Sequence, residues 1–210
     1  MNKLFSTAVI ALIGSTEAKF HLGHCPHVDY MQDFDKEAYS GEWYEIFRDK
    51  HNMYTWGAEC VTKEFSLNDE GSVDLYFRGK YDNHWFFRSW SGYHGIDGTM
   101  YNCGKSQDPN EWTCEATMGQ HSKKLHPFKI FDTDYENYEI SYSCWSFLGL
   151  FKFDNLAISS RTPDMSQETQ EKVRDIIEQK LPHYKLDKGM HWTKQADKGQ
   201  CQYDWRFRKD

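Results

Sequence analysis

Three histidines near the start of the chain have the spacing and chemistry to bind a metal. His21, His24 and His27 flank Cys25 and Pro26. Imidazole and thiolate groups are ligands for transition metals, and a cysteine-proline element could hold haem iron. Such a site requires a free Cys25 and a rigid backbone. We expect neither, because Cys25 belongs to an even set of cysteines and the segment shows no helix or strand pattern. We therefore expect no metal site here.

Cysteines are the second reactive set. An even number in an oxidising compartment predicts disulfide bonds, three of them for these six: Cys25, Cys60, Cys103, Cys114, Cys144 and Cys201. Their order in the chain allows fifteen connectivities. None forms a Cys-x-x-Cys pair, so zinc or thioredoxin-like chemistry is not expected. Cys103 and Cys114 flank a turn-rich segment with Asp108-Pro109-Asn110, which favours a local bridge between these two.

Catalytic groups are harder to find. With every cysteine expected in a disulfide, no nucleophile and base stand at a spacing that suggests covalent catalysis. Glu45 and Glu139 fall at inward strand positions and could serve as acids. A buried carboxylate is more often structural, so we expect no enzyme activity.

Composition and charge narrow the class of protein further. The 210 residues suit one domain with a sizeable core, and aromatic residues make up 17% of the chain. The net charge is −7 and no basic cluster occurs. We therefore expect no nucleic-acid partner and no binding to an anionic membrane surface.

The first eighteen residues have the pattern of a secretory signal peptide. Lys3 supplies the positive charge, residues 4–13 form a short apolar run, and Thr16-Glu17-Ala18 places small residues at a cleavage position. The run is too short to cross a bilayer, and no later run could be transmembrane. We expect a signal peptide at 1–18, a secreted protein and no transmembrane segment.

Strand-like runs follow one another from residue 41, joined mostly by tight turns and without intervening helices. The expected strands are 41–50, 60–67, 73–81, 85–94, 111–118, 128–132, 138–144 and 155–160. This pattern predicts an all-β fold, an eight-stranded antiparallel up-and-down β-barrel. The expected organisation is an N-terminal arm at 19–40, the barrel with its stapled C-terminal segment at 41–201, and a tail at 202–210.

One amphipathic helix follows the last strand. Within 166–181, Val173, Ile176, Ile177 and Leu181 recur at helical spacing. Ser166 is a suitable N-cap, and Pro182 ends the helix. Its single apolar stripe must pack on the outside of the barrel. Outward-facing residues of the last two strands lie beneath it, and we expect the helix to be their only apolar cover: Ile140, Tyr142, Leu156 and Ile158.

Three short motifs resemble the signature regions of the lipocalin family. They are Gly41-Glu42-Trp43-Tyr44, Thr133-Asp134-Tyr135 and Arg161, in the family's order and spacing. The resemblance implies that Trp43 closes one end of the barrel and that Arg161 lies over its indole ring, a cation–π contact. Gly41, Trp43, Thr133, Asp134, Tyr135 and Arg161 are then structural residues.

Further sequence features resemble apolipoprotein D and its bilin- and retinol-binding relatives within that family. Among them are Cys25-Pro26, Tyr142-Ser143-Cys144 and the turn Ser160-Arg161-Thr162-Pro163. This resemblance implies disulfides from Cys25 to Cys144 and from Cys60 to Cys201. Cys103 and Cys114 are left as the third pair, which departs from the apolipoprotein D pattern but agrees with their local spacing.

The resemblance places the functional site inside the barrel. Alternation along the strands predicts which side chains point into the barrel, and Trp90 is one further candidate. The expected ligand-binding residues are Val61, Lys63, Phe65, Val73, Leu75, Phe77, Trp90, Phe128 and Ile130. Lys63 could meet a ligand carboxylate near the mouth, although such a lysine more often extends to solvent. The small Ala157 and Ser159 leave room in the cavity. Apolar side chains could equally fill a core.

The function implied is a secreted carrier of one small hydrophobic molecule. A fatty acid, sterol, retinoid, carotenoid, bilin or haem would suit such a barrel, and no cofactor is required. We expect a monomer or weak homo-oligomer, and no sequence feature identifies a receptor. The alternative is a lipocalin-like enzyme acting on a lipid or carotenoid, as an isomerase or de-epoxidase.

Overall fold

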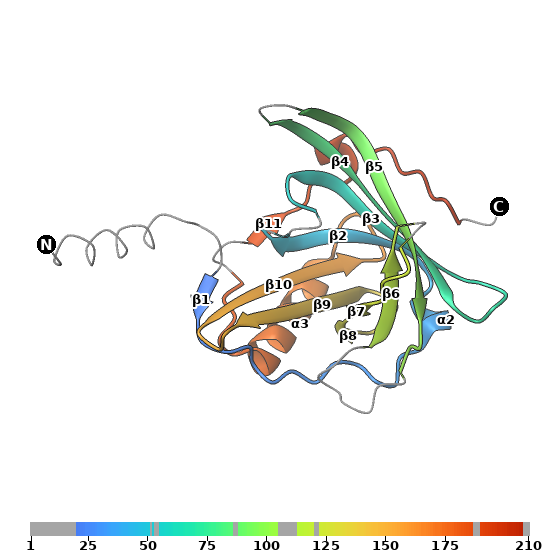
Figure 1. The fold of residues 1–210 in the computed structure, drawn as a ribbon. Coiled ribbons are helices and arrows are strands. Elements are labelled where there is room, and N and C mark those ends of the chain that lie inside the picture. Colours follow the sequence, from blue (N-terminus) through green and yellow to red (C-terminus); the bar gives the residue numbers. More distant parts are fainter. Residues whose placement is uncertain are drawn as a thin grey trace, which may run out of the picture.

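The computed structural model describes residues 20–50, 52, 55–85, 88–104, 113–119, 122–186 and 190–207. The expected signal peptide at 1–18 lies outside the described residues. Within the described ranges the chain forms an antiparallel β-barrel with one long helix on its outer face (Figure 1). The fold class predicted from the sequence is therefore confirmed.

The barrel wall consists of consecutive strands in the order β7-β6-β5-β4-β3-β2-β10-β9-β8. Their bounds are β2 (Gly41–Asp49), β3 (Ala58–Leu67), β4 (Val73–Trp85), β5 (Arg88–Tyr101), β6 (Cys114–Met118), β7 (His126–Phe128), β8 (Ile130–Thr133), β9 (Tyr138–Phe147) and β10 (Phe151–Ser160). The wall therefore has nine strands where the sequence predicted eight. The expected strand 128–132 is two short strands separated by Lys129. Since β7 pairs with β6 and β8 with β9, this interrupted segment joins the two ends of the sheet.

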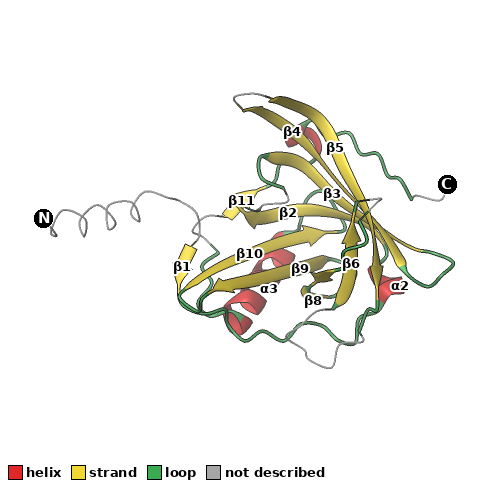
Figure 2. Ribbon diagram, in the orientation of Figure 1, coloured by secondary structure: helices red, strands yellow, loops and turns green. Residues whose placement is uncertain are grey.

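Short elements off this nine-strand path attach the terminal segments to it (Figure 2). They are β1 (Phe20–Leu22), which pairs with β10, α2 (Lys36–Tyr39), β11 (Met190–Trp192), which pairs with β2, and α4 (Ala196–Gly199). The N-terminal arm was expected to lack rigid structure, and that expectation is wrong. It carries β1 and α2, and its Cys25 is bonded to Cys144.

The β4–β5 hairpin differs most from the predicted boundaries. The sequence predicted strands at 73–81 and 85–94, whereas β4 runs on to Trp85 and β5 spans Arg88–Tyr101. Glycines inside β5 obscured its length. A Cβ added at Gly95 would collide with the ring of Tyr76, and one at Gly98 would collide with the backbone oxygen of Thr117. These glycines allow close approach of neighbouring groups within a continuous strand.

The long helix α3 (Gln167–Lys180) covers one outer face of the barrel. Ser166 accepts a hydrogen bond from the Thr169 backbone N–H at 3.1 Å, as an N-cap residue does. Val173 and Ile177 are buried in one cluster with the outward residues of β9 and β10: Ile140, Tyr142, Leu156 and Ile158. The helix is not their only apolar cover, because the same cluster includes Val28, Tyr30, Tyr203 and Trp205, which come from the two terminal segments.

The end of the barrel beside α2 is closed by Trp43. The Trp43 side chain is fully buried, and the Arg161 guanidinium carbon lies 3.8 Å from the centre of its ring. Arg161 also donates hydrogen bonds to the backbone oxygens of Tyr135 at 2.9 Å and Ala38 at 2.8 Å. A Cβ at Gly41 would come within 3.0 Å of the same guanidinium. The predicted contact between Trp43 and Arg161 is present, and these residues form the floor.

The turn before β9 supports this floor. Thr133 Oγ1 donates to the Tyr138 backbone oxygen at 2.6 Å and accepts from the Tyr135 N–H. Asp134 accepts backbone hydrogen bonds from Asn137 at 2.8 Å and Tyr138 at 3.1 Å. Partial burial raises the Asp134 pKa, but these hydrogen bonds and that from Lys172 outweigh it and lower the pKa to about 2.

Candidate functional site

A cavity of about 590 Å³ lies inside the barrel beyond the Trp43 floor. This volume falls within the range of about 300–1,000 Å³ typical of small-molecule sites. Residues from β2 to β7 and from β9 and β10 line it, so nearly every strand of the wall contributes. The cavity therefore belongs to the barrel as a whole.

One side of the cavity carries most of its apolar surface. Its lining side chains come from strands β3 to β7 and include Val61, Phe77, Ile96, Met118 and Phe128. Phe77 and Ile96 face each other across the β4–β5 pair. The long β4–β5 hairpin thus supplies both an aromatic and an aliphatic surface to the same side.

The residues proposed from the sequence divide between the cavity and the floor. Val61, Lys63, Phe77 and Phe128 line the cavity. Four others lie deeper, in the buried cluster that contains Trp43: Phe65, Val73, Leu75 and Ile130. Trp90 lies in β5 opposite Asn83, and its side chain is outside the described part of the structure.

Several lining residues were missed from the sequence. His94, Ile96 and Met118 were missed because the boundaries and parity of β5 and β6 were not clear. The pairing of Ile96 with the correctly assigned Phe77 is the signal that could have placed them, since directly paired residues project to one face. Tyr81 and His94, whose rings are 5.8 Å apart, complete this part of the lining.

The opposite side, formed by β9 and β10, is polar. Its inward positions pair Ser143 with Asn155, Ser141 with Ala157, and Glu139 with Ser159. We call these six residues the polar wall. Ala157 lines the cavity as expected, whereas Ser159 is fully buried below it. Asn155 also lines the cavity, and its Oδ1 atom is buried without a hydrogen-bond partner among the described residues.

A buried ion pair crosses the deep part of the barrel from β3 to β9. Lys63 Nζ lies 2.5 Å from Glu139 Oε1, with 10% of the lysine side chain and none of the glutamate exposed. Lys63 therefore does not extend to solvent, and its charge is compensated within the barrel. The hydroxyl of Tyr39 lies beside this pair. Burial and then the charge of Glu139 raise the Tyr39 pKa well above its usual value.

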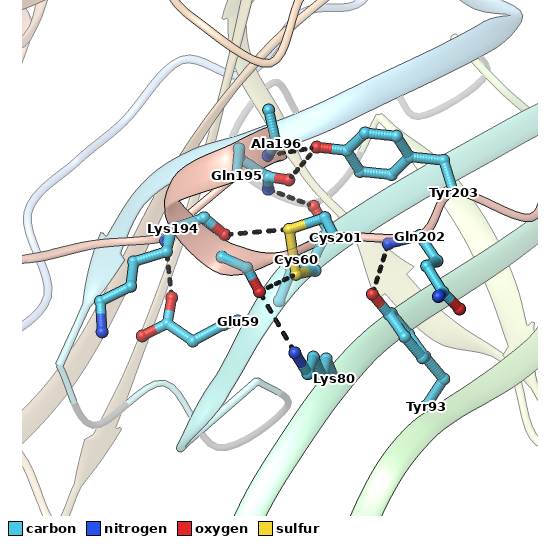
Figure 3. The surroundings of a disulfide bond; sticks show 12 residues. Glu59, Cys60, Lys80, Tyr93, Lys194, Gln195, Ala196, Cys201, Gln202 and Tyr203 are labelled. Carbon is cyan, nitrogen blue, oxygen red and sulfur yellow. Dashed lines mark hydrogen bonds between the residues drawn. A yellow bond between two sulfur atoms is a disulfide. The ribbon is translucent and has the colours of Figure 1, made fainter.

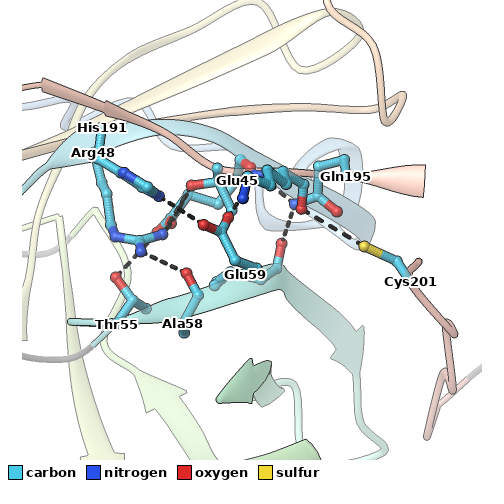
Figure 4. Close-up of polar contacts among 11 residues, drawn as sticks. Glu45, Arg48, Thr55, Ala58, Glu59, His191, Gln195 and Cys201 are labelled. Atoms are coloured by element: carbon cyan, nitrogen blue, oxygen red, sulfur yellow. Dashed lines mark hydrogen bonds and ion pairs between the residues drawn. The ribbon is translucent and has the colours of Figure 1, made fainter. Parts of the chain in front are cut away.

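A second buried ion pair joins two residues of β2 that lie on either side of the register shift between β2 and β10 (Figure 4). Arg48 Nη1 donates to Glu45 Oε1 at 2.7 Å and to Thr193 Oγ1 at 2.8 Å, and Nη2 donates to the Ala58 backbone oxygen at 2.5 Å. Thr193 Oγ1 also donates to Glu45, at 2.9 Å. Glu45 and Arg48 are almost completely buried. The expected acid Glu45 is thus held in a dense hydrogen-bond network.

Residues 190–201, here called the side-wall segment, complete the barrel between β2 and β3. β2 pairs with β3 over Gly41–Tyr44, and beyond Tyr44 its edge pairs with β11. Gln195 Nε2 then bridges the two strands, donating to the backbone oxygens of Glu45 at 2.9 Å and Val61 at 2.8 Å. The C-terminal segment is therefore part of the wall around the cavity.

The Cys60–Cys201 disulfide holds the side-wall segment in place (Figure 3). Beside it, the Cys60 N–H donates to the Lys194 backbone oxygen at 2.9 Å, and Lys80 donates to the Gly199 backbone oxygen at 3.2 Å. The structure also contains the Cys25–Cys144 and Cys103–Cys114 bonds. The Cys25–Cys144 and Cys60–Cys201 bonds are the pairs that the family resemblance implied, and Cys103–Cys114 is the pair that local spacing favoured.

The histidines of the N-terminal arm do not form a cluster in the described structure. His27 lies on the surface, 3.4 Å from Asp29, and the His24 ring packs close to Gly149. The side chain of His21 is outside the described residues. Across the described residues, no group of three or more His, Cys, Asp and Glu side chains could hold a metal ion. Among the same residues, no helix is long and apolar enough to cross a membrane.

The barrel, its Trp43 floor and its internal cavity define a lipocalin. The chain belongs to the lipocalin / cytosolic fatty-acid binding protein family, whose model matches residues 40–188. It is 30% identical over 178 residues to apolipoprotein D from Bos taurus, across 83% of this chain and 86% of that protein. Bilin-binding protein from Pieris brassicae is 26% identical over 137 residues, 65% of this chain and 66% of that protein.

Solved structures show the same architecture. Insecticyanin from the tobacco hornworm Manduca sexta superimposes with a TM-score of 0.68 at 19% identity, covering 89% of this chain and 93% of that chain. At this identity the similarity establishes the fold. The resemblance inferred from the short motifs and cysteines is thus confirmed by the family match and by the apolipoprotein D relatives.

Proposed function

We propose that this protein is a secreted carrier that encloses one small hydrophobic molecule in its barrel. The observation that carries the proposal is the cavity of about 590 Å³, closed at one end by Trp43 and Arg161. The apolar side built from β3 to β7 offers a surface on which a ligand can lose its contact with water. Removal of apolar ligand surface from water contributes about 25 cal/mol per Å².

Secretion and ligand class rest on independent support. The signal-like sequence at 1–18 and three disulfides favour an oxidising, extracellular environment. One relative is named for bilin binding. A bilin therefore stands beside fatty acids, sterols, retinoids, carotenoids and haem among the ligands to test.

Organic extraction of the purified native protein followed by mass spectrometry tests this proposal. We expect a hydrophobic molecule to be released, and an absorbance spectrum would reveal a bilin, carotenoid or haem. For the stripped protein, tryptophan quenching with one member of each ligand class measures binding. If nothing co-purifies and no member of the panel binds, the carrier function is wrong. Conversion of a bound lipid or carotenoid into product would instead support the enzyme alternative.

A pair of matched variants locates binding in the cavity. Ala157→Phe adds volume inside the polar wall, whereas Ser146→Phe adds the same group at an exposed position of β9. We expect the first substitution to weaken binding at least about tenfold and the second to leave it unchanged, because a close-packed interior does not absorb extra volume freely. Thermal unfolding of both variants verifies that they are folded. Equal binding by the two would place the ligand elsewhere.

A further inference from the structure

The charges inside the barrel point to a narrower ligand class. We propose that the cavity selects uncharged apolar molecules carrying a hydroxyl group over carboxylic acids and amines of the same skeleton. This inference rests on the proposed carrier function. It is carried by two observations, the pairing of the interior charges and the unmatched amide of Asn155.

The interior charges compensate one another. Lys63 is paired with Glu139 at 2.5 Å, and Arg48 with Glu45 at 2.7 Å. The two other cationic lining residues are engaged outside the cavity. Arg78 stacks on the Tyr93 ring at 4.0 Å and donates to the Gln202 backbone oxygen, and Lys129 lies over the Tyr30 ring at 4.8 Å.

A charged ligand would have to disrupt one of these pairs. A carboxylate that took Lys63 would leave Glu139, which has no exposed surface, as an uncompensated buried charge. An amine that took Glu139 would leave Lys63 in the same position. Removing one partner of a buried pair is strongly unfavourable, whereas an uncharged ligand leaves the pair intact.

Asn155 supplies the hydrogen-bonding partner for an uncharged group. It lines the cavity, its Oδ1 atom is buried without a donor, and its side chain makes no hydrogen bond to another described residue. An unmatched buried acceptor is unfavourable, so a ligand that donates to it gains affinity. An amide offers one acceptor and two donors, and a hydroxyl can both donate to it and accept from it. A methyl ester can only accept.

The test measures four head groups on two skeletons. The C16 set is hexadecanol, palmitic acid, methyl palmitate and hexadecylamine; the retinoid set is retinol, retinoic acid, retinyl acetate and retinylamine. Binding to the stripped full-length mature protein at pH 8, where an ordinary imidazole is neutral, is followed by tryptophan quenching. On the skeleton that fits, we expect the alcohol to bind at least about tenfold more tightly than the acid or amine.

Two variants assign the selectivity to its residues. Glu139→Gln leaves Lys63 without its countercharge, so the affinity for the acid should rise about tenfold while that for the alcohol changes little. The matched control is Asp132→Asn, which removes the partner of Lys180 from the outer surface. Asn155→Leu should reduce alcohol binding to the level of the ester, and it remains informative should Glu139→Gln fail to fold.

The outcomes separate this inference from the carrier function. Equal or tighter binding of the acid or amine by the native protein would overturn the inference and leave the carrier function standing. Alcohol affinity unchanged in Asn155→Leu would also overturn the role of the amide. Failure of every probe on both skeletons, together with no co-purified ligand, would instead overturn the carrier function.

Discussion

Two buried ion pairs inside one barrel differ in how they are held. Arg48 contacts Glu45, Thr193 and the Ala58 backbone oxygen, so one guanidinium connects β2, the start of β3 and the side-wall segment. Lys63 and Glu139 are joined by one hydrogen-bonded contact, which crosses the barrel from β3 to β9. The planar arginine fork suits several fixed partners, whereas the lysine ammonium is a flexible point charge.

The difference indicates two uses of buried charge. Glu45 and Arg48 join parts of the wall that regular strand pairing does not join, so their role is architectural. Lys63 lines the cavity and Glu139 neutralises it, so this pair sets the electrostatic character of the cavity. The comparison can be tested by removing each pair and measuring stability.

Replacement of both members of the first pair should have the largest effect. In Glu45→Leu/Arg48→Met, the Ala58 backbone oxygen and Thr193 hydroxyl lose their donors in a buried region. We expect the free energy of unfolding to fall by about 3–5 kcal/mol, measured by urea denaturation. Arg48→Lys keeps the positive charge but not the planar guanidinium fork. Its free energy of unfolding should lie between that of the double variant and that of the native protein. A loss below about 1 kcal/mol would contradict an architectural role.

Removal of the side-wall disulfide should have the next largest effect. Cys60→Ser/Cys201→Ser releases residues 141 positions apart, and we expect a loss of about 2–5 kcal/mol in the free energy of unfolding. The side-wall segment is part of the wall around the cavity and contacts Glu45 and Arg48. Without the disulfide that holds it, ligand dissociation should also accelerate. The matched control, Cys103→Ser/Cys114→Ser, opens a loop of 11 residues and should leave the dissociation rate unchanged. Stopped-flow displacement measures both rates.

A partly exposed ion pair provides the reference for the two buried ones. Asp134 lies 3.1 Å from Lys172 and its pKa is lowered to about 2, below the value of about 3.9 for an unfolded aspartate. The stabilisation is therefore fully present above about pH 4 and is lost as the pH falls through about 2. Asp134→Asn should reduce stability by about 1 kcal/mol at pH 7. An equal loss of stability at pH 2 and pH 7 would show that the ionised Asp134 carboxylate is not the source of the stabilisation.

The second buried pair should be the easiest to replace. In Lys63→Met/Glu139→Leu, two apolar side chains of similar length occupy the deep part of the barrel. We expect the free energy of unfolding to change by less than about 1 kcal/mol, since such replacements are often neutral. Differential scanning calorimetry of this variant and Glu45→Leu/Arg48→Met gives the direct comparison. Equal losses in the two would show that both pairs are architectural.

The floor of the barrel was predictable from the sequence because it depends on short motifs. Trp43, Arg161 and the Thr133–Tyr135 turn have fixed spacing and few alternatives, and the structure brings them together. The helix was predictable for a similar reason, since its apolar period and its Ser166 cap agree. Local patterns were sufficient where the structure depends on neighbouring residues.

The cavity was less predictable because its lining depends on pairing between distant residues. The glycines of β5 obscured the register that places Ile96 opposite Phe77. Alternation identified Lys63 as inward but could not reveal Glu139, which is 76 residues away, as its partner. Nor could it show that Gln195 bridges β2 and β3. These contacts form only when the barrel closes, and the residue pattern within one strand does not predict them.

The side-wall segment also sets the order of events during biosynthesis. A chain emerges from the ribosome N-terminal end first, so every strand from β2 to β10 is available before residues 190–201. Cys103 and Cys114 are only 11 residues apart and can be oxidised early, whereas Cys60 must await a partner 141 residues later. Before residues 190–201 have been synthesised, β2 and β3 lack the pairing with β11 and the Gln195 bridge that complete this flank.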